Sequence, residues 1–257
     1  MNHCMSLPIL RSKAVCMHGF RLPMSVCVIS VSLLLLAITI PAATATGPYY
    51  PPYYASFYGG PPGSTRGCGG QNYIDQSPYA NITDGSVLTA TRSYASCISG
   101  SGAGVDTWEG FWGPTFTVSK NATYLIRYPW VLSWDAAIAT SICDGYGSNN
   151  AEISLQVWGN LWDATHSGWS LGNDARTPVF SISGVNCGLG WSTSGRAQSF
   201  VVSFETPSLL LVGETYQFYT YMTTHTAAAA DGDAWAQAGV NVGTSGDIGY
   251  IYHMDVL

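Results

Sequence analysis

Charged residues are scarce in this chain, and basic residues are the scarcest of them. The 257 residues include nine Lys and Arg against fifteen Asp and Glu. Three of the basic residues, Arg11, Lys13 and Arg21, precede an apolar run near the N-terminus, so the rest of the chain carries six basic and fifteen acidic residues. A chain this acidic lacks the basic surface that neutralises phosphates, and we therefore expect no nucleic-acid partner.

The spacings that mark several common sites are also missing. His166, His225 and His253 are far apart with no H-x-x-x-H spacing, and the glycine-rich stretch 100–104 has no βαβ context for a dinucleotide. Oxygen-bearing side chains gather at 144–152 and at Asp231-Gly-Asp233, as calcium prefers, but without the spacing of an EF-hand. We predict neither a cofactor nor a metal site, with calcium at one of these turns as the alternative.

An uncharged run of seventeen residues, Met24 to Ile40, follows the three basic residues and precedes the small residues at 41–45. Basic, apolar and small segments in this order are typical of a secretory signal peptide. We predict a signal peptide at 1–45, cleaved after Ala45. The alternative is an uncleaved membrane anchor, since the run is just short of a bilayer core. In both cases the rest of the chain is exported.

Four cysteines follow this leader: Cys68, Cys97, Cys143 and Cys187. An even number in an exported chain indicates disulfides, and the wide spacing argues against zinc. Three pairings are possible, and we prefer Cys68–Cys97 with Cys143–Cys187 because nearest neighbours close the smaller loops. The sequons at Asn81 and Asn121 are predicted glycosylation sites.

Two regions follow the leader. Residues 46–66 are rich in tyrosine, proline and glycine, and prolines lack a backbone donor, so we predict a linker rather than a packed element. A partner-binding arm that displays its tyrosine rings is the alternative. Residues 67–257 are predicted to form a single disulfide-stabilised domain.

The dominant hydrophobic period in that domain is two, the period of a β-strand. Ile153, Leu155 and Val157 alternate with polar residues, and Tyr216, Phe218, Thr220 and Met222 share one face. Gly, Asn, Asp and Ser clusters separate such runs as turns do. We predict an all-β, two-sheet antiparallel sandwich of jelly-roll or Greek-key type. Only 223–233, with four consecutive alanines, could equally be a helix or a hairpin.

Tryptophans are concentrated in the middle of the domain. An exposed indole stacks on the apolar face of a sugar ring, while neighbouring amides and carboxylates bind its hydroxyls. Core packing is the competing explanation for any single tryptophan. The stretch 157–169 reads as a loop that mixes tryptophans with polar residues. The predicted ligand-binding residues are Trp158, Asn160, Trp162, Asp163, Trp169, Trp108 and Trp112.

These observations favour a secreted or cell-surface, non-catalytic protein that binds a glycan or another cell-surface component through loop aromatics. The first alternative is a structural or adhesive surface protein that uses the Tyr/Pro segment for protein contacts. The second is a carbohydrate-active enzyme with Glu109 as its catalytic carboxylate, since flanking Trp108 and Phe111 suit a raised pKa. A membrane is expected to be a partner only through an uncleaved N-terminal segment.

Overall fold

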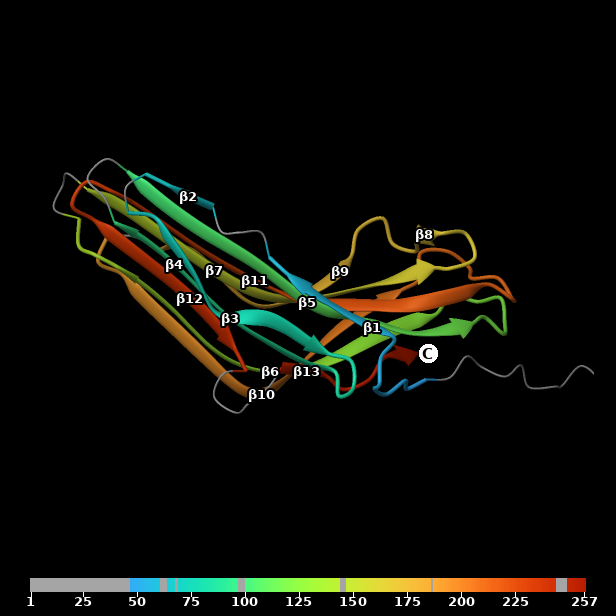
Figure 1. Cartoon of the computed structure of the whole chain (residues 1–257). Coiled ribbons are helices and arrows are strands. Elements are labelled where there is room, and N and C mark those ends of the chain that lie inside the picture. Colours follow the sequence, from blue (N-terminus) through green and yellow to red (C-terminus); the bar gives the residue numbers. More distant parts are fainter. Residues whose placement is uncertain are drawn as a thin grey trace, which may run out of the picture. The chain divides into compact units, whose positions relative to one another are not determined.

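The computed structural model describes residues 47–60, 64–67, 69–96, 100–143, 147–185, 187–243 and 249–257. Within these ranges the chain forms two antiparallel β-sheets packed face to face, with no helix (Figure 1). The predicted all-β, two-sheet sandwich is confirmed. No helix in the described ranges has the length and apolar character to cross a membrane.

The first sheet has the strand order β1-β5-β11-β7-β8, with β2 also pairing with β5 and β9 also pairing with β7. Its two central strands, β5 and β11, pair along almost their whole length. The strands of this sheet are β1 (Ala55–Gly59), β2 (Ser64–Arg66), β5 (Ser101–Thr117), β7 (Ser148–Asp163), β8 (Gly168–Trp169), β9 (Ala175–Val185) and β11 (Thr215–Asp231).

The second sheet has the order β10-β6-β12-β4, with β3 on the outer edge of β4. Two short strands complete it, since β13 pairs with both β4 and β6 and β14 pairs with β6. The strands of this sheet are β3 (Gln71–Asn81), β4 (Ser86–Ser96), β6 (Leu125–Thr140), β10 (Gly190–Glu205), β12 (Trp235–Val242), β13 (Gly249–Ile251) and β14 (Asp255–Val256).

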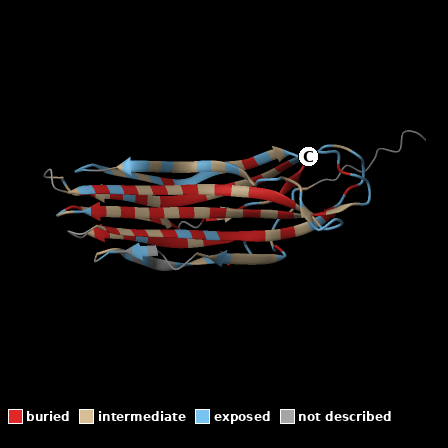
Figure 2. Cartoon of the chain, turned by 90° about the horizontal axis from the view of Figure 1, so that it is seen from above, coloured by how far each residue is buried: buried red, intermediate tan, exposed pale blue. Residues whose placement is uncertain are grey.

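Alternation along the strands divides each sheet into an inner and an outer face. In β11 every second residue from Tyr216 to Ala230 is buried against the other sheet, and the residues between them are half-buried on the outside. Figure 2 shows this pattern as red and tan bands along the central strands. The alanine-rich stretch 223–233 therefore extends β11 into a turn at Gly232, whose φ is +67°. Burial of Ala228 and Ala230 in the sandwich outweighs the helical propensity of alanine.

The segment before β2 is packed, so the prediction of a linker was wrong for its described part. Tyr53 is buried; its ring contacts Phe111 at 5.1 Å, and its hydroxyl donates to the carbonyl of Ile251 at 3.0 Å. Residues 55–59 then form β1 along the edge of β5. The prolines remove backbone donors only at their own positions, whereas Tyr53, between these prolines and β1, packs into the core.

The Cys143–Cys187 disulfide is present, as the spacing predicted. It joins the chain just before β7 to the turn between β9 and β10. Buried Asn149 supports it, because its amide donates to the carbonyls of Ser141 and Trp235 and accepts from the backbone N–H of Cys187. The predicted signal peptide, Cys68 and Cys97 lie outside the described residues.

Candidate functional site: an aromatic face on the first sheet

Aromatic side chains from five strands meet on the outer face of the first sheet. Strand alternation places them there, since they stand at the positions between the buried residues of β5, β7 and β11. Cross-strand register then brings them side by side: Tyr219 lies opposite Trp112, and Tyr221 lies opposite Trp158. We define the aromatic face as Phe57, Trp112, Trp158, Trp162, Trp169, Tyr219 and Tyr221.

The rings of the aromatic face are in continuous contact, with Tyr219 at the centre. Its ring centroid lies 4.6 Å from Trp112, 4.8 Å from Trp169, 5.2 Å from Phe57 and 5.4 Å from Tyr221. The outer members extend the cluster, because Trp158 lies parallel to Tyr221 at 5.9 Å and Trp162 meets Trp169 edge-on at 5.1 Å. Each ring of the aromatic face therefore packs against at least one other ring of the face.

Two glycines fix β1 beside this cluster. Phe57 lies opposite Gly110 of β5, where a Cβ atom would be 2.7 Å from the Phe57 Cζ. In the same pair of strands Trp108 lies opposite Gly59, whose Cβ would be 3.3 Å from the indole. Each glycine thus leaves room for an aromatic ring of the other strand, and Phe57 reaches across β5 to Tyr219 and Tyr221.

Polar side chains border the aromatic face next to β9. The Asp174 carboxylate accepts hydrogen bonds from the Asn160 amide and from the Tyr221 hydroxyl, each at 2.7 Å. The Arg176 guanidinium lies 5.7 Å from the Trp158 ring centroid, within cation–π range. Burial, with the charge of Asp174, raises the pKa of Tyr219 to about 12, and burial with the Asp174 hydrogen bond raises the pKa of Tyr221. Both phenols therefore stay neutral near pH 7.

The structure brings together five of the seven predicted ligand-binding residues: Trp112, Trp158, Asn160, Trp162 and Trp169. Trp108 lies on the same face but over Gly59, beside the cluster. The expectation that loops carry these residues was wrong, because β7 continues through Trp162 and only the two-residue β8 holds Trp169. Trp130 and Trp134 are buried in the core.

Sequence reasoning missed Phe57, Tyr219, Tyr221, Asp174 and Arg176. The two tyrosines had a usable signal, since they alternate with residues already assigned to the inner face of β11. Phe57 had none, because its part in the cluster depends on pairing with β5, which is distant from it in the sequence.

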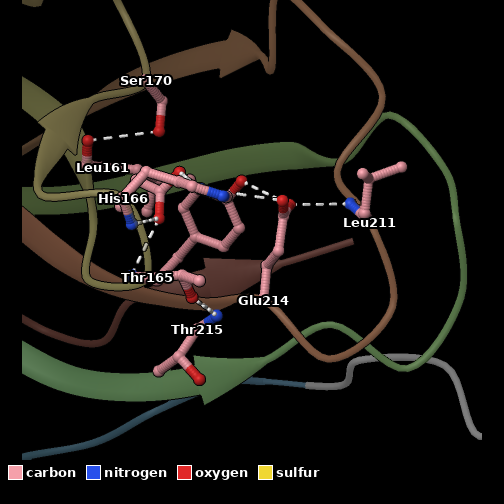
Figure 3. Close-up of polar contacts among 9 residues, drawn as sticks. Leu161, Thr165, His166, Ser170, Leu211, Glu214 and Thr215 are labelled. Atoms are coloured by element: carbon pink, nitrogen blue, oxygen red, sulfur yellow. Dashed lines mark hydrogen bonds and ion pairs between the residues drawn. The ribbon is translucent and has the colours of Figure 1, made fainter.

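Asp163, the remaining predicted residue, holds a turn at the end of β7. Figure 3 shows Thr165 and His166 of this turn beside Glu214. Its carboxylate accepts the backbone N–H groups of Thr165 and His166 at 2.9 Å and lies 2.8 Å from the His166 Nδ1. Glu214 lies 3.7 Å from the same nitrogen and accepts from the Tyr216 hydroxyl at 2.9 Å. This polar cluster ties the loop after β7 to the start of β11, and it does not contribute to the aromatic face.

The His166 cluster makes a testable prediction about titration. The hydrogen bond and charge of Asp163 raise the pKa of His166, so its midpoint in an NMR titration should lie above 6.5. The stabilisation that the Asp163–His166 ion pair contributes is therefore fully present just below pH 6.5, and it is lost as pH rises through the folded-state midpoint. Asp163→Asn should lower that midpoint; an unchanged midpoint would show that Asp163 does not hold the imidazolium.

A Gly-x-Ser-x-Gly pattern at 168–172, absent from the sequence predictions, coincides with this region. In a nucleophile elbow the serine stands on a strand-to-helix turn next to a histidine. Here the pattern begins in β8 and continues into bends, and the Ser170 hydroxyl donates to the Leu161 carbonyl at 3.2 Å. The context that the motif requires is therefore not found among the described residues.

Glu109 points into the sandwich core and is fully buried. Burial raises the pKa of its carboxyl to about 8, partly offset by the nearby hydroxyls of Thr107 and Thr89. Neither carboxyl oxygen reaches hydrogen-bonding geometry with a described residue. The raised pKa expected from the sequence is present, but the side chain lies where no polysaccharide reaches it.

The remaining candidates have local contacts. No group of three or more His, Cys, Asp or Glu side chains in the described ranges is arranged to hold a metal ion, and residues 144–146 of the first calcium candidate lie outside them. Asp231 bonds the backbone of Gly232 in the β11–β12 turn. Asn81 braces a turn through Thr83 and Asp84, while exposed Asn121 accepts from the Val212 N–H. Glycosylation at the two asparagines stays a prediction.

No protein-family model and no curated protein matches the chain. One of the solved structures similar to it is TmCBM61 in complex with β-1,4-galactotriose, at 8% sequence identity and a TM-score of 0.17. The match covers 75% of this chain and 89% of the other. A likeness at this TM-score carries no argument about function, and the case for a function depends on the aromatic face itself.

Proposed function

We propose that this protein is a non-catalytic, secreted or cell-surface β-sandwich that binds an extracellular carbohydrate through the aromatic face. The observation that carries the proposal is the contact of seven rings on the outside of a sheet, where packing inside the core does not explain them. Trp169 is 44% exposed although it touches three other rings of the cluster. Indole and phenol rings of this kind stack on the C–H face of a sugar.

The dimensions and polar border of the face suit an oligosaccharide. The cluster runs across the strands from β1 to β8, four strand spacings or about 19 Å. A chain of several sugar rings fits that length. Asp174 and Arg176 lie at its border, and side chains of these types bind hydroxyl groups, while buried Asn160 holds Asp174 in place. Because the rings stand on paired strands rather than on loops, the binding surface is formed before the ligand arrives.

The proposed location has separate support. The Cys143–Cys187 disulfide persists in an oxidising compartment, and the expected leader at 1–45 would export the chain to one.

A glycan array probed with the purified protein, followed by titration calorimetry on the best ligand, tests the proposal. Trp169→Ala and Trp158→Ala should each weaken binding about tenfold or more, since one lost stacking contact and its buried area are worth roughly 1.4 kcal/mol. Tyr79→Ala is the matched control, because Tyr79 is a similarly exposed ring on β3 of the other sheet. It should bind as the unmodified protein does.

The alternatives predict other results. Absence of binding to any glycan would overturn the proposal, as would equal losses in the Tyr79 control. Release of shortened products from a bound glycan would favour an enzyme. Self-association would favour an adhesive protein, but deletion of 47–63 is a poor test because it removes buried Tyr53. Tyr54→Ala and Tyr58→Ala, at two exposed rings of the same segment, are the better variants.

A further inference from the structure

A groove of about 910 Å³ crosses the outer face of the second sheet, on the side of the sandwich opposite to the aromatic face. Ligand sites in proteins have volumes of a few hundred to about a thousand Å³. Four neighbouring strands, β4, β12, β6 and β10, contribute to its walls and floor. Its polar lining includes Arg92, Asp135, Ser192, Ser194, Gln237 and Asn241.

The strand register explains why the sheet is hollow here. One row of outward positions across the four strands reads Arg92, Gly239, Ala137 and Ser192. Glycine and alanine at the centre of that row leave a trough between polar neighbours. Asn241 and Asp135 stand in the adjacent row on one side, and Gln237 stands in the row on the other side. Amide and carboxylate groups therefore flank a floor of small residues.

One end of the trough is fixed by a β-bulge in β10, between Gly195 and Gln198. The Arg196 side chain extends from the bulge. Its guanidinium donates to both carboxylate oxygens of Asp135, at 3.2 and 3.1 Å, and to the Trp134 carbonyl. Ala197 adopts a φ of +48°, a strained conformation for a residue with a Cβ. Bulges and strained residues of this kind are common next to functional sites, where they aim a side chain.

We propose that this groove is a second ligand site, which binds a glycan chain across the four strands by hydrogen bonds rather than by stacking. The described lining contains amides, hydroxyls, a carboxylate and a guanidinium but no aromatic ring. Such a set of donors and acceptors, around a floor of small apolar residues, matches a polyhydroxylated chain. The proposal goes beyond the first function, because the groove shares no residue with the aromatic face.

Gly239 provides the test, because it is the floor of the trough and tolerates a side chain. A Cβ atom there would meet only ordinary contacts, the nearest being the Thr91 carbonyl oxygen at 3.7 Å. Gly239→Phe should therefore fold and fill the groove, and Gly239→Ala is the matched control. Gln237→Ala removes a flanking amide without adding volume, so it tests the site even if the phenylalanine variant does not fold.

The assay is the glycan array, with Trp169→Ala, Gly239→Phe and the double variant compared side by side. We expect Trp169→Ala to keep binding to a subset of glycans, and Gly239→Phe and Gln237→Ala to weaken that subset tenfold or more while Gly239→Ala keeps it. Loss of all binding in Trp169→Ala, with Gly239→Phe and Gln237→Ala unaffected, would overturn the second site and leave the aromatic one. Loss only in Gly239→Phe and Gln237→Ala would support the groove and overturn the aromatic site.

Discussion

Replacing Glu109 with glutamine should remove most of the pH dependence of folding stability between pH 5 and pH 8. Burial raises the pKa of this carboxyl from 4.5 to about 8, so the folded state binds its proton more tightly than the unfolded chain does. The contribution of Glu109 to the free energy of unfolding is therefore most favourable below about pH 4.5, and it declines as pH rises to the folded-state pKa. At pH 7 the free energy of unfolding should be about 3 kcal/mol lower than it is below pH 4.5, because of this one group.

Urea unfolding at pH 5, 7 and 8.5 measures this effect. The unmodified protein should lose stability over that range, whereas Glu109→Gln should change little, because the amide has the same shape and cannot ionise. Glu205→Gln is the control, since Glu205 is an exposed glutamate on β10. If the glutamine variant at 109 loses stability as steeply as the unmodified protein, a group other than Glu109 causes the pH dependence.

The surroundings of Glu109 in the core explain why its carboxyl stays protonated rather than being stabilised as an anion. Threonines from both sheets lie near it, but their hydroxyls pair with one another, as in the 2.6 Å contact between Thr107 and Thr224. Burial is the largest influence on the pKa of Glu109, and the charge of no described residue offsets it. A neutral acid is therefore the form that this core accepts.

Gly110→Ala should destabilise the protein and disrupt the aromatic face together. The added Cβ would lie 2.4 Å from the Thr220 carbonyl oxygen and 2.7 Å from the Phe57 ring, and the backbone oxygen has no room to move within a paired strand. Overpacking of this kind costs about 1–3 kcal/mol or more. Because Phe57 rests on Gly110, we also expect β1 to detach and glycan affinity to fall with the loss of one side of the cluster.

Two measurements separate these effects: urea unfolding for stability, and limited proteolysis within 47–60 for detachment of β1. The matched control is Gly172→Ala, since a Cβ at Gly172 would have no neighbour within 4 Å. That variant should remain within about 0.5 kcal/mol of the parent. Normal stability and an uncut β1 in Gly110→Ala would show that the interlock between β1 and β5 does not hold the segment.

The fold could be predicted from local pattern because strand alternation is a local property. Runs such as 153–157 and 216–222 show which residues face inward, and nearest-neighbour spacing identified the Cys143–Cys187 pair. The same alternation could have placed Trp158 and Trp162 on a strand, but glycine and asparagine between them made 157–169 resemble a loop. Alternation gives no information about the register between strands that are distant in the sequence.

Both errors at the N-terminal segment and at the site have this non-local origin. Proline content predicted an unpacked segment, yet Tyr53 is buried against Phe111 and Ile251, which are distant in sequence. Likewise the aromatic face required Phe57, Trp112 and Tyr219 to arrive from three strands. The types of single residues indicated the chemistry of the site, but which residues lie together depends on strand pairing.

The bridge between Tyr49 and Met254 has a mechanical consequence. Their backbone groups exchange hydrogen bonds of 2.8 and 3.0 Å, so the chain enters and leaves the sandwich at one place. Tension applied between these two points would open that bridge first and then peel the short terminal strands away one hydrogen bond at a time. The long β5–β11 ladder would not be loaded in shear, so the domain should yield at low force when pulled from both ends.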